Sequence, residues 1–202
     1  MTNRVNHKAF ANRRLRIGEF LRRRLVTFQR RADGSIAAEA VIIFPILLWA
    51  LLATYVYFDA VRMKSLNIKA GYTIADALSR AASVDSNDMQ RLNDLIWLMT
   101  GERTNNDLRV TVVNYDPDDD LYSVSWSKER GNHYTEMDDE ELEAMRDRLP
   151  PANRFDSLIL VENVVSYEPL FEVGMSTIEL ENFAVTRPRF TTGLCWDDST
   201  DC

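Results

Sequence analysis

The stretch Ala40–Phe58 reads AVIIFPILLWALLATYVYF and holds nineteen residues without a formal charge. A helix rises about 1.5 Å per residue, so this run would span roughly 28 Å, close to the thickness of the hydrocarbon layer of a bilayer. The run has no polar face, which disfavours a helix lying in the membrane surface. The stretch therefore predicts a transmembrane helix that anchors the chain.

The charges before and after this stretch differ in sign. Residues 1–33 carry ten Lys and Arg against two acidic residues, a net charge of +8, and because the whole chain carries −7 the remaining residues carry −15. Basic residues before a membrane span are retained in the cytoplasm, so we expect a cytoplasmic N-terminus and an outer C-terminal part. A basic leader beside a membrane suits anionic lipid headgroups, and an acidic outer part disfavours nucleic-acid binding.

A removable secretory signal does not fit this stretch. Such signals combine a short basic region, an apolar run of about 7–15 residues and small residues at the cleavage site. Here the leader and the apolar run are both longer, and the run ends at Tyr57-Phe58-Asp59-Ala60, where bulky rings stand in place of small residues. We therefore expect conventional signal peptidase to leave the helix in place.

A short motif directly precedes the apolar run. Gly34 is followed by Ser35-Ile36-Ala37-Ala38 and Glu39, and Pro45 lies within the run. This segment, residues 30–60, resembles the processing site of the type IV prepilin superfamily, and most closely that of TadE-like proteins of the tight-adherence (Flp-type) pilus system. The resemblance implies that a prepilin peptidase cuts after Gly34 and leaves Ser35 as the first residue. Ala40 departs from the family, in which an aromatic residue commonly follows the glutamate.

The residue types of the motif suit these roles. Gly34 has no Cβ, so its backbone can lie extended in a narrow protease site. Glu39 would lie near the helix start, where exposed N–H groups favour a negative charge, and a carboxylate near lipid needs a partner such as the Ser35 ammonium of this or a neighbouring subunit. Glu39 is therefore our candidate for subunit docking. The alternative is a plain linker and helix cap, although a capping box would place the acid at position 38, which is Ala.

The pattern divides the chain into a basic leader (residues 1–34), a transmembrane helix (35–58), a helical stalk (59–83) and an outer domain (84–202). The helical pattern continues beyond the membrane, and Gly71 is a candidate bend or boundary because glycine costs a helix about 1 kcal/mol against alanine. A short membrane helix followed by a separate helix fits the pattern equally well.

The outer domain has the composition and patterning of a small α+β fold. A helix is expected over 88–99, capped by Ser86 or Asn87, and an acidic helix over 138–148. In the segment LYSVSWS the alternation predicts Tyr122, Val124 and Trp126 on one face. Four antiparallel strands with helices on one side would bury a sufficient core. The family resemblance implies that this arrangement is pilin-like. The predicted strands are 107–115, 121–127, 158–167 and 177–186.

Residues that could carry chemistry are few. His7 and His133 are the only histidines, and the anchor would place them on opposite sides of the membrane. His133 lies in a predicted loop beside Gly131 and Asn132, where a solvated histidine is a better interpretation than a catalytic one. We therefore expect neither an enzyme nor a cofactor or small-molecule substrate.

An acidic turn deserves comparison with a calcium loop. Asp116, Asp118 and Asp120 have the spacing that opens such a loop, but the glycine and the closing glutamate of the pattern are replaced by Leu121 and Ser127. A polar hairpin turn explains the three acids better, and no metal site is predicted.

The two cysteines, Cys195 and Cys202, lie in the segment LCWDDSTDC. An oxidising outer compartment favours a disulfide that closes this small loop, and pairing between chains is the alternative. A loop this short would stabilise little of the domain.

These features, with the family resemblance, favour a structural protein: a minor pilin or pseudopilin held in the bacterial inner membrane by a single helix, with a periplasmic C-terminal domain. Its partners would be the membrane, a prepilin peptidase and other pilus-assembly subunits, and it would enter or help to start an extracellular fibre. The alternative is a membrane-anchored scaffold or binding protein that never enters a fibre.

Overall fold

The computed structural model describes residues 33–101, 106–152 and 156–197, with side chains from Ala37 onward. The chain divides into two compact units, Met1–Ala53 and Thr54–Cys202. The predicted basic leader lies outside the described residues up to position 32.

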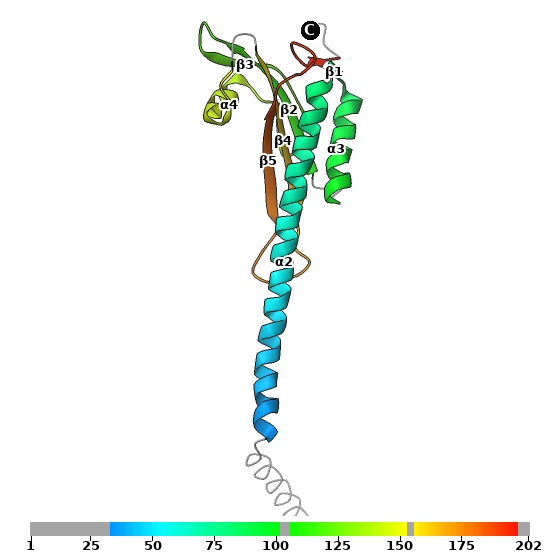
Figure 1. Cartoon of the computed structure of the whole chain (residues 1–202), viewed down its shortest axis with the longest axis vertical. Helices are drawn as coiled ribbons and strands as arrows, with labels where there is room; N and C mark the ends of the chain where they lie inside the picture. Colours follow the sequence, from blue (N-terminus) through cyan, green and yellow to red (C-terminus); the bar gives the residue numbers. More distant parts are fainter. Residues whose placement is uncertain (1–32, 102–105, 153–155, 198–202) are drawn as a thin grey trace, which may run out of the picture. The chain divides into compact units, whose positions relative to one another are not determined.

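One helix, α2 (Asp33–Arg80), contains the whole apolar run and continues past it (Figure 1). It is the one described helix that is long and apolar enough to cross a membrane. Pro45 lies inside α2, and the helix passes through Gly71 without ending. The structure therefore has a single extended helix in place of the two separate helices that the sequence also allowed.

The second unit is built on a four-stranded antiparallel sheet of order β3-β2-β4-β5. The bounds agree with the predicted strands to within three residues, which confirms the α+β class. Two short parallel strands that the sequence did not predict pair separately. The strands are β1 (Ser83–Val84), β2 (Asn106–Asp116), β3 (Leu121–Arg130), β4 (Ser157–Tyr167), β5 (Ile178–Thr186) and β6 (Cys195–Trp196).

The predicted facing of β3 is wrong at one position. The pairing with β2 shifts register, so that Trp126 lies opposite Val112 while Val124 lies opposite Val113. The extra residue, Ser125, forms a β-bulge, which reverses the alternation of side chains beyond it. Trp126 therefore packs on the core that contains α2 and α3, whereas Tyr122 and Val124 pack on the opposite core.

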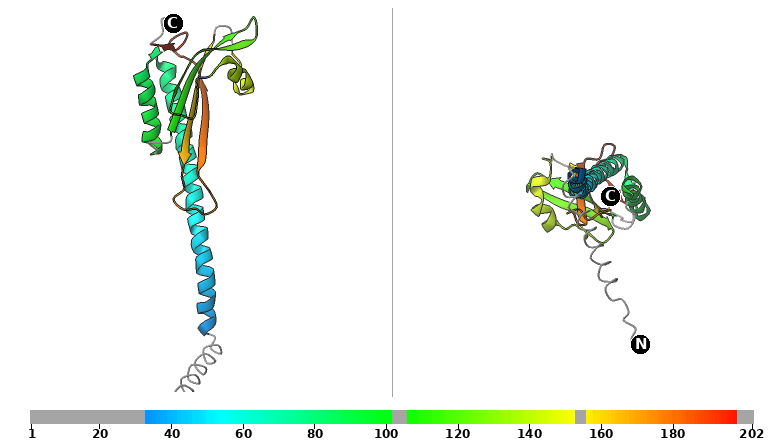
Figure 2. Two further views of the ribbon diagram at one scale, coloured as in Figure 1. Left: turned by 180° about the vertical axis from the view of Figure 1, so that it is seen from behind. Right: turned by 90° about the horizontal axis from the view of Figure 1, so that it is seen from below.

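Helices cover both faces of the sheet, which corrects the expectation of helices on one side (Figure 2). On one face, Ile74 and Leu78 of α2 and Ile96 of α3 (Ser86–Thr100) share a core with sheet residues. On the other face, Leu142 of α4 (Asp139–Ala144) packs against Leu158 and its neighbours. The sheet needs both covers because every residue of β4 except Ser166 is buried, on whichever face its side chain lies.

Local capping explains where the shorter helices begin and end. Asp85, one residue before the predicted cap, accepts a hydrogen bond from the Asp88 N–H while the Asp88 side chain accepts one from Asp85, a complete capping box. Gly101 ends α3 in the left-handed region at φ 83°. The predicted acidic helix is shorter than expected: α4 begins after the N-cap Asp138 and is followed by a 3-10 turn, η1 (Arg146–Arg148).

Candidate functional site

The predicted processing and docking residues lie at the start of α2. The helix begins at Asp33, so Gly34 and Ser35 are within its first turn and Glu39 follows Ser35 by about 6 Å along the helix axis. Glu39 is exposed. The spacing places a carboxylate one turn from the backbone nitrogen that cleavage after Gly34 would convert into an ammonium.

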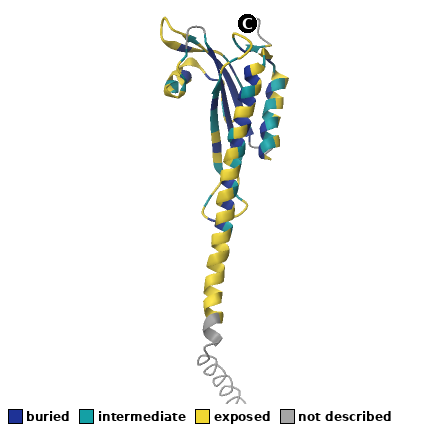
Figure 3. Cartoon of the chain, viewed as in Figure 1, coloured by how far each residue is buried: buried dark blue, intermediate teal, exposed yellow. Residues whose placement is uncertain are grey.

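The helix surface that follows is apolar and uncovered (Figure 3). Large side chains of the first unit are open to their surroundings, with Val41 at 74% and Phe44 at 67% exposed. Within α2, only 6% of the 18-residue window that is apolar enough to cross a membrane is buried. Such a surface is stable in lipid or against other apolar helices, and costly in water.

Within the second unit, α2 is fixed to the sheet by a chain of buried asparagines. Asn163 of β4 is fully buried and donates from Nδ2 to Oδ1 of Asn67 on the helix. Asn182 of β5 in turn donates to Asn163 Oδ1 at 2.9 Å, and Asn67 donates to the Leu180 carbonyl. These bonds satisfy polar groups that would otherwise be costly in a dry interface, so they fix the register of the helix on the sheet.

Gly71 allows this close approach. A Cβ built on Gly71 would lie 2.5 Å from Oδ1 of Asn163 and would also overlap Nδ2 of Asn182. Sequence reasoning treated Gly71 as a candidate break and did not find the asparagine chain. The signal was present in β4, where Asn163 interrupts a run of β-branched and aliphatic residues that asparagine rarely joins.

A tyrosine forms a second link between the sheet and α2. The hydroxyl of Tyr167, a residue 2% exposed, lies 3.1 Å from the Asp59 carboxylate and 3.3 Å from the Val56 carbonyl, and it donates to these acceptors. Burial, and then the hydrogen bond to Asp59, raise the pKa of Tyr167 to about 12. The bond lies near the start of the second unit and ties the end of β4 to the helix.

On the opposite face a buried arginine links α4 to the sheet. Arg109 of β2, 3% exposed, bonds through Nε to Glu162 of β4 at 2.7 Å and through both terminal nitrogens to Glu141 of α4 at 2.7 and 3.0 Å. It also donates to the Thr135 carbonyl and lies 5.0 Å from the Tyr134 ring centroid. Every arm of the guanidinium is occupied, so this is a structural cluster rather than a free anion site.

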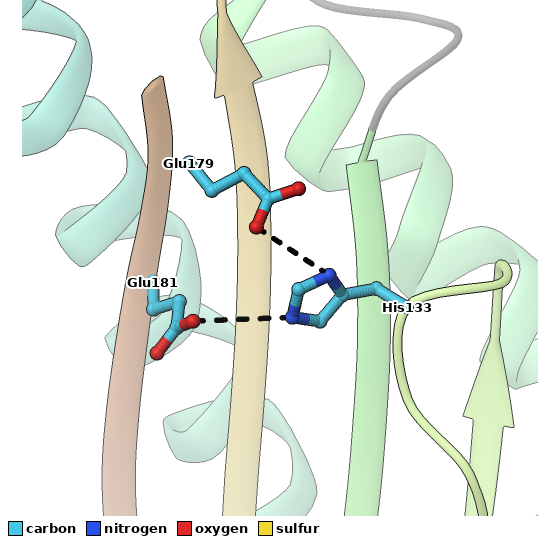
Figure 4. A group of neighbouring side chains, drawn as sticks. All are labelled: His133, Glu179 and Glu181. Carbon is cyan, nitrogen blue, oxygen red and sulfur yellow. Dashed lines mark ion pairs between the residues drawn. The ribbon is translucent and has the colours of Figure 1, made fainter. Parts of the chain in front are cut away.

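Near this cluster His133 lies between two carboxylates of β5 (Figure 4). Its Nδ1 is 3.8 Å from Glu179 and its Nε2 is 3.9 Å from Glu181. All three residues are exposed, and one atom from each lies within 4.8 Å of the others. The sequence did not bring these residues together, because only the pairing of β5 with β4 places the two glutamates beside the loop that holds the histidine.

The geometry favours ion pairing over a metal centre. A single cation binds one ring nitrogen, yet the two nitrogens of His133 face different carboxylates in Figure 4. When the imidazole is protonated it can pair with Glu179 and Glu181 together, and exposed pairs of this kind contribute about 1 kcal/mol or less. The cluster therefore holds the loop loosely against β5.

The acidic turn is engaged by other protein groups. Asp120 has φ 52° and accepts hydrogen bonds from the Tyr115 hydroxyl and from Arg146 of η1, both at 2.8 Å for Oδ1. The Tyr115 hydrogen bond, with the Arg146 charge, lowers the pKa of Asp120. Asp118 N–H donates to the Asp116 side chain at 2.9 Å, the geometry of a polar turn.

The C-terminal segment carries one of the two cysteines in β6. Cys195 is disulfide-bonded. Its predicted partner, Cys202, lies outside the described residues. Backbone hydrogen bonds from Cys195 N–H to the Ala82 carbonyl and from Asp197 N–H to the Val84 carbonyl fix the segment to the bend after α2 and to β1.

No known family, curated protein or solved structure matches this chain. The features that bear on function are the Gly34-Ser35 motif with Glu39, the exposed apolar part of α2, and the packing of its C-terminal part on the sheet.

Proposed function

We propose that the chain is a structural subunit of a tight-adherence (Flp-type) pilus system, a TadE-like minor pilin or pseudopilin anchored by one helix in the bacterial inner membrane. The observation that carries the proposal is the helix α2. Its first part exposes an apolar surface after the Gly34-Ser35 motif and Glu39, and its second part is built into the core of an α+β unit. An exposed apolar helix surface can be covered by the helices of other subunits, so this chain is suited to a structural role in assembly rather than to catalysis.

The position of the Glu39 carboxylate also supports the proposal. A carboxylate at the edge of an apolar helix is expensive in lipid unless it is paired. Cleavage after Gly34 would create an ammonium one turn away, in this subunit or, after sliding of one helix past another, in its neighbour. Pairing of this kind would set the stagger between subunits. The work of the chain would then be assembly, with the prepilin peptidase and other pilus subunits as its partners.

The first test is the N-terminal residue of the mature chain. Mass spectrometry of membranes with and without the prepilin peptidase of the pilus system should find Ser35 at the start only when the peptidase is present. An intact leader in both membranes would contradict processing and would favour a permanent anchored scaffold.

A second test separates assembly from anchoring. Glu39→Ala should abolish incorporation into sheared pilus fractions while leaving membrane insertion intact. Glu172→Ala, which removes an exposed carboxylate from the second unit, is the matched control and should assemble normally. Normal assembly of Glu39→Ala would exclude the docking role.

A further inference from the structure

A cavity of about 440 Å³ opens beside the sheet in the second unit, between strands β2, β3 and β4 and the C-terminal segment. Its volume falls in the range of small-molecule sites, roughly 300–1,000 Å³. The strands supply Asn114, Ser125 and Ser157, and the segment supplies Thr191 and Thr192. All five side chains are hydroxyls or an amide, which both donate and accept hydrogen bonds without carrying charge.

One of these groups lacks a partner. Ser157 is 6% exposed, and its Oγ makes no hydrogen bond within the described residues. A buried hydroxyl left without a partner costs about 1–3 kcal/mol, so such groups mark places where a ligand or an ordered water completes the site. Ser157 lines the cavity, and its Oγ lies next to Gly193, where a Cβ would be 3.9 Å from the oxygen, an ordinary contact.

The bulge in β3 shapes the same cavity. It gives β3 one residue more than its partner, and both Ser125 and Trp126 line the cavity as a result. The indole of Trp126 is held by a 2.7 Å hydrogen bond from Nε1 to the Leu194 carbonyl and by the ring of Trp196, 5.5 Å away between centroids. A fixed indole offers a flat apolar surface beside the hydroxyl and amide groups.

We propose that this cavity binds a neutral sugar. The described residues that line it include no charged side chain, so a charged ligand would lose its hydration without gaining a counter-charge. A wholly apolar ligand would leave the five polar groups, with Ser157 foremost, unpaired. A pyranose combines an apolar C–H face for the indole with hydroxyls that match Ser125, Ser157 and Asn114. The proposal is independent of the pilus assignment and of processing at Gly34.

The test uses the full chain in phosphatidylcholine nanodiscs, prepared without glycoside detergents because these carry a sugar. The probes are glucose, galactose, mannose and N-acetylglucosamine, followed by ligand-detected NMR, with glucuronate as the charged comparison. We expect at least one neutral sugar to bind saturably with a dissociation constant of about 1 mM or tighter, and glucuronate to bind at least about tenfold more weakly. Binding of none of the neutral sugars, or equal binding of glucuronate, would overturn the proposal and leave the cavity to water.

Variants locate the binding. Ser125→Trp fills the cavity from an exposed position and should weaken binding at least about tenfold. Thr73→Trp places the same side chain on an exposed position of α2 and should leave binding unchanged. Sugar binding that survives Ser125→Trp would place the site elsewhere and refute the assignment.

Two buried sheet serines on opposite faces distinguish a binding role from a structural one. Ser157→Ala removes the unpartnered hydroxyl, so it should weaken sugar binding severalfold while leaving the melting temperature equal or higher. Ser127→Ala removes a hydroxyl that bonds Thr111 at 2.8 Å and the Met137 N–H at 2.9 Å, so it should lower the melting temperature and leave sugar binding unchanged. Unaltered binding in Ser157→Ala would contradict the role given to that hydroxyl.

Discussion

At the scale of single residues, Tyr167 makes stability depend on alkaline pH. Its pKa is raised to about 12 in the folded chain by burial and by Asp59, against about 10 for an exposed tyrosine. The folded state therefore keeps the phenolic proton longer than the unfolded state. The corresponding stability is complete below about pH 10 and is lost as the pH rises from about 10 to about 12, at about 1.4 kcal/mol per pH unit.

Thermal unfolding of the wild type and of Tyr167→Phe in nanodiscs, measured from about pH 9 to about pH 11, should isolate this loss. Phenylalanine does not ionise, so the difference in melting temperature between the two proteins should shrink as the pH rises. Tyr134 has a raised pKa too, through burial, but it is present in both proteins and cancels. A difference that stays constant across this range would show that Tyr167 keeps an ordinary pKa.

Gly71 illustrates how tertiary contact reverses a local preference. Replacing a helical glycine by alanine normally stabilises by about 1 kcal/mol. Here the new methyl group would displace the amides of Asn163 and Asn182, so we expect Gly71→Ala to destabilise by about 2 kcal/mol despite its helix propensity. In an Asn182→Ala background the same substitution should cost less, and equal costs in the two backgrounds would show that the methyl group does not disturb the asparagines.

At the scale of elements, α4 depends on the buried ion cluster of Arg109. Glu162→Ala leaves the buried Nε–H of Arg109 without its acceptor while Glu141 still neutralises the guanidinium. It should therefore lower the free energy of unfolding by about 1.5–3 kcal/mol, the usual contribution of a hydrogen bond to a charged group. Glu143→Ala removes an exposed carboxylate of α4 that pairs only loosely with Arg146 and should cost less than about 1 kcal/mol. Urea unfolding monitored by circular dichroism provides both values, and similar costs would refute the central role of Arg109.

The sequence predicted the helices and the main strands well, but it did not predict the strand register or the contacts between elements. The four strands of the main sheet followed from alternation and turn residues, and their observed bounds agree to within three residues, whereas the short strands β1 and β6 did not follow from the sequence. The bulge at Ser125 could not be predicted, because LYSVSWS alternates perfectly and the register shift is decided by pairing with β2 and by the packing of Trp126. The cavity beside Ser157 and the contact of His133 with the glutamates of β5 could not be predicted either, because both depend on residues that are far apart in the sequence.

At the scale of the whole molecule, the core of the second unit depends on α2, the same helix that contains the apolar segment. Ala70, Ile74 and Leu78 of α2 are buried in one core with Leu108 and Ile159 of the sheet. A pattern-based division at residue 84 separates these side chains from their partners, whereas the compact unit begins at Thr54. The Gly34-Ser35 motif lies in the first turn of α2, whereas the last turns of the helix pack on the sheet.

A pair of truncated chains tests this dependence. We expect residues 54–202 to be soluble and to unfold cooperatively, since they retain the helix face and its asparagine contacts. Residues 84–202 should lack a cooperative transition, because each lost large aliphatic contact costs about 2–3 kcal/mol and together these losses approach the stability of a typical domain, about 5–15 kcal/mol. Calorimetry of both fragments decides the matter. A cooperative transition in residues 84–202 similar to that of the longer fragment would mean that the sheet and α3 form a sufficient core and that α2 is docked onto a finished domain.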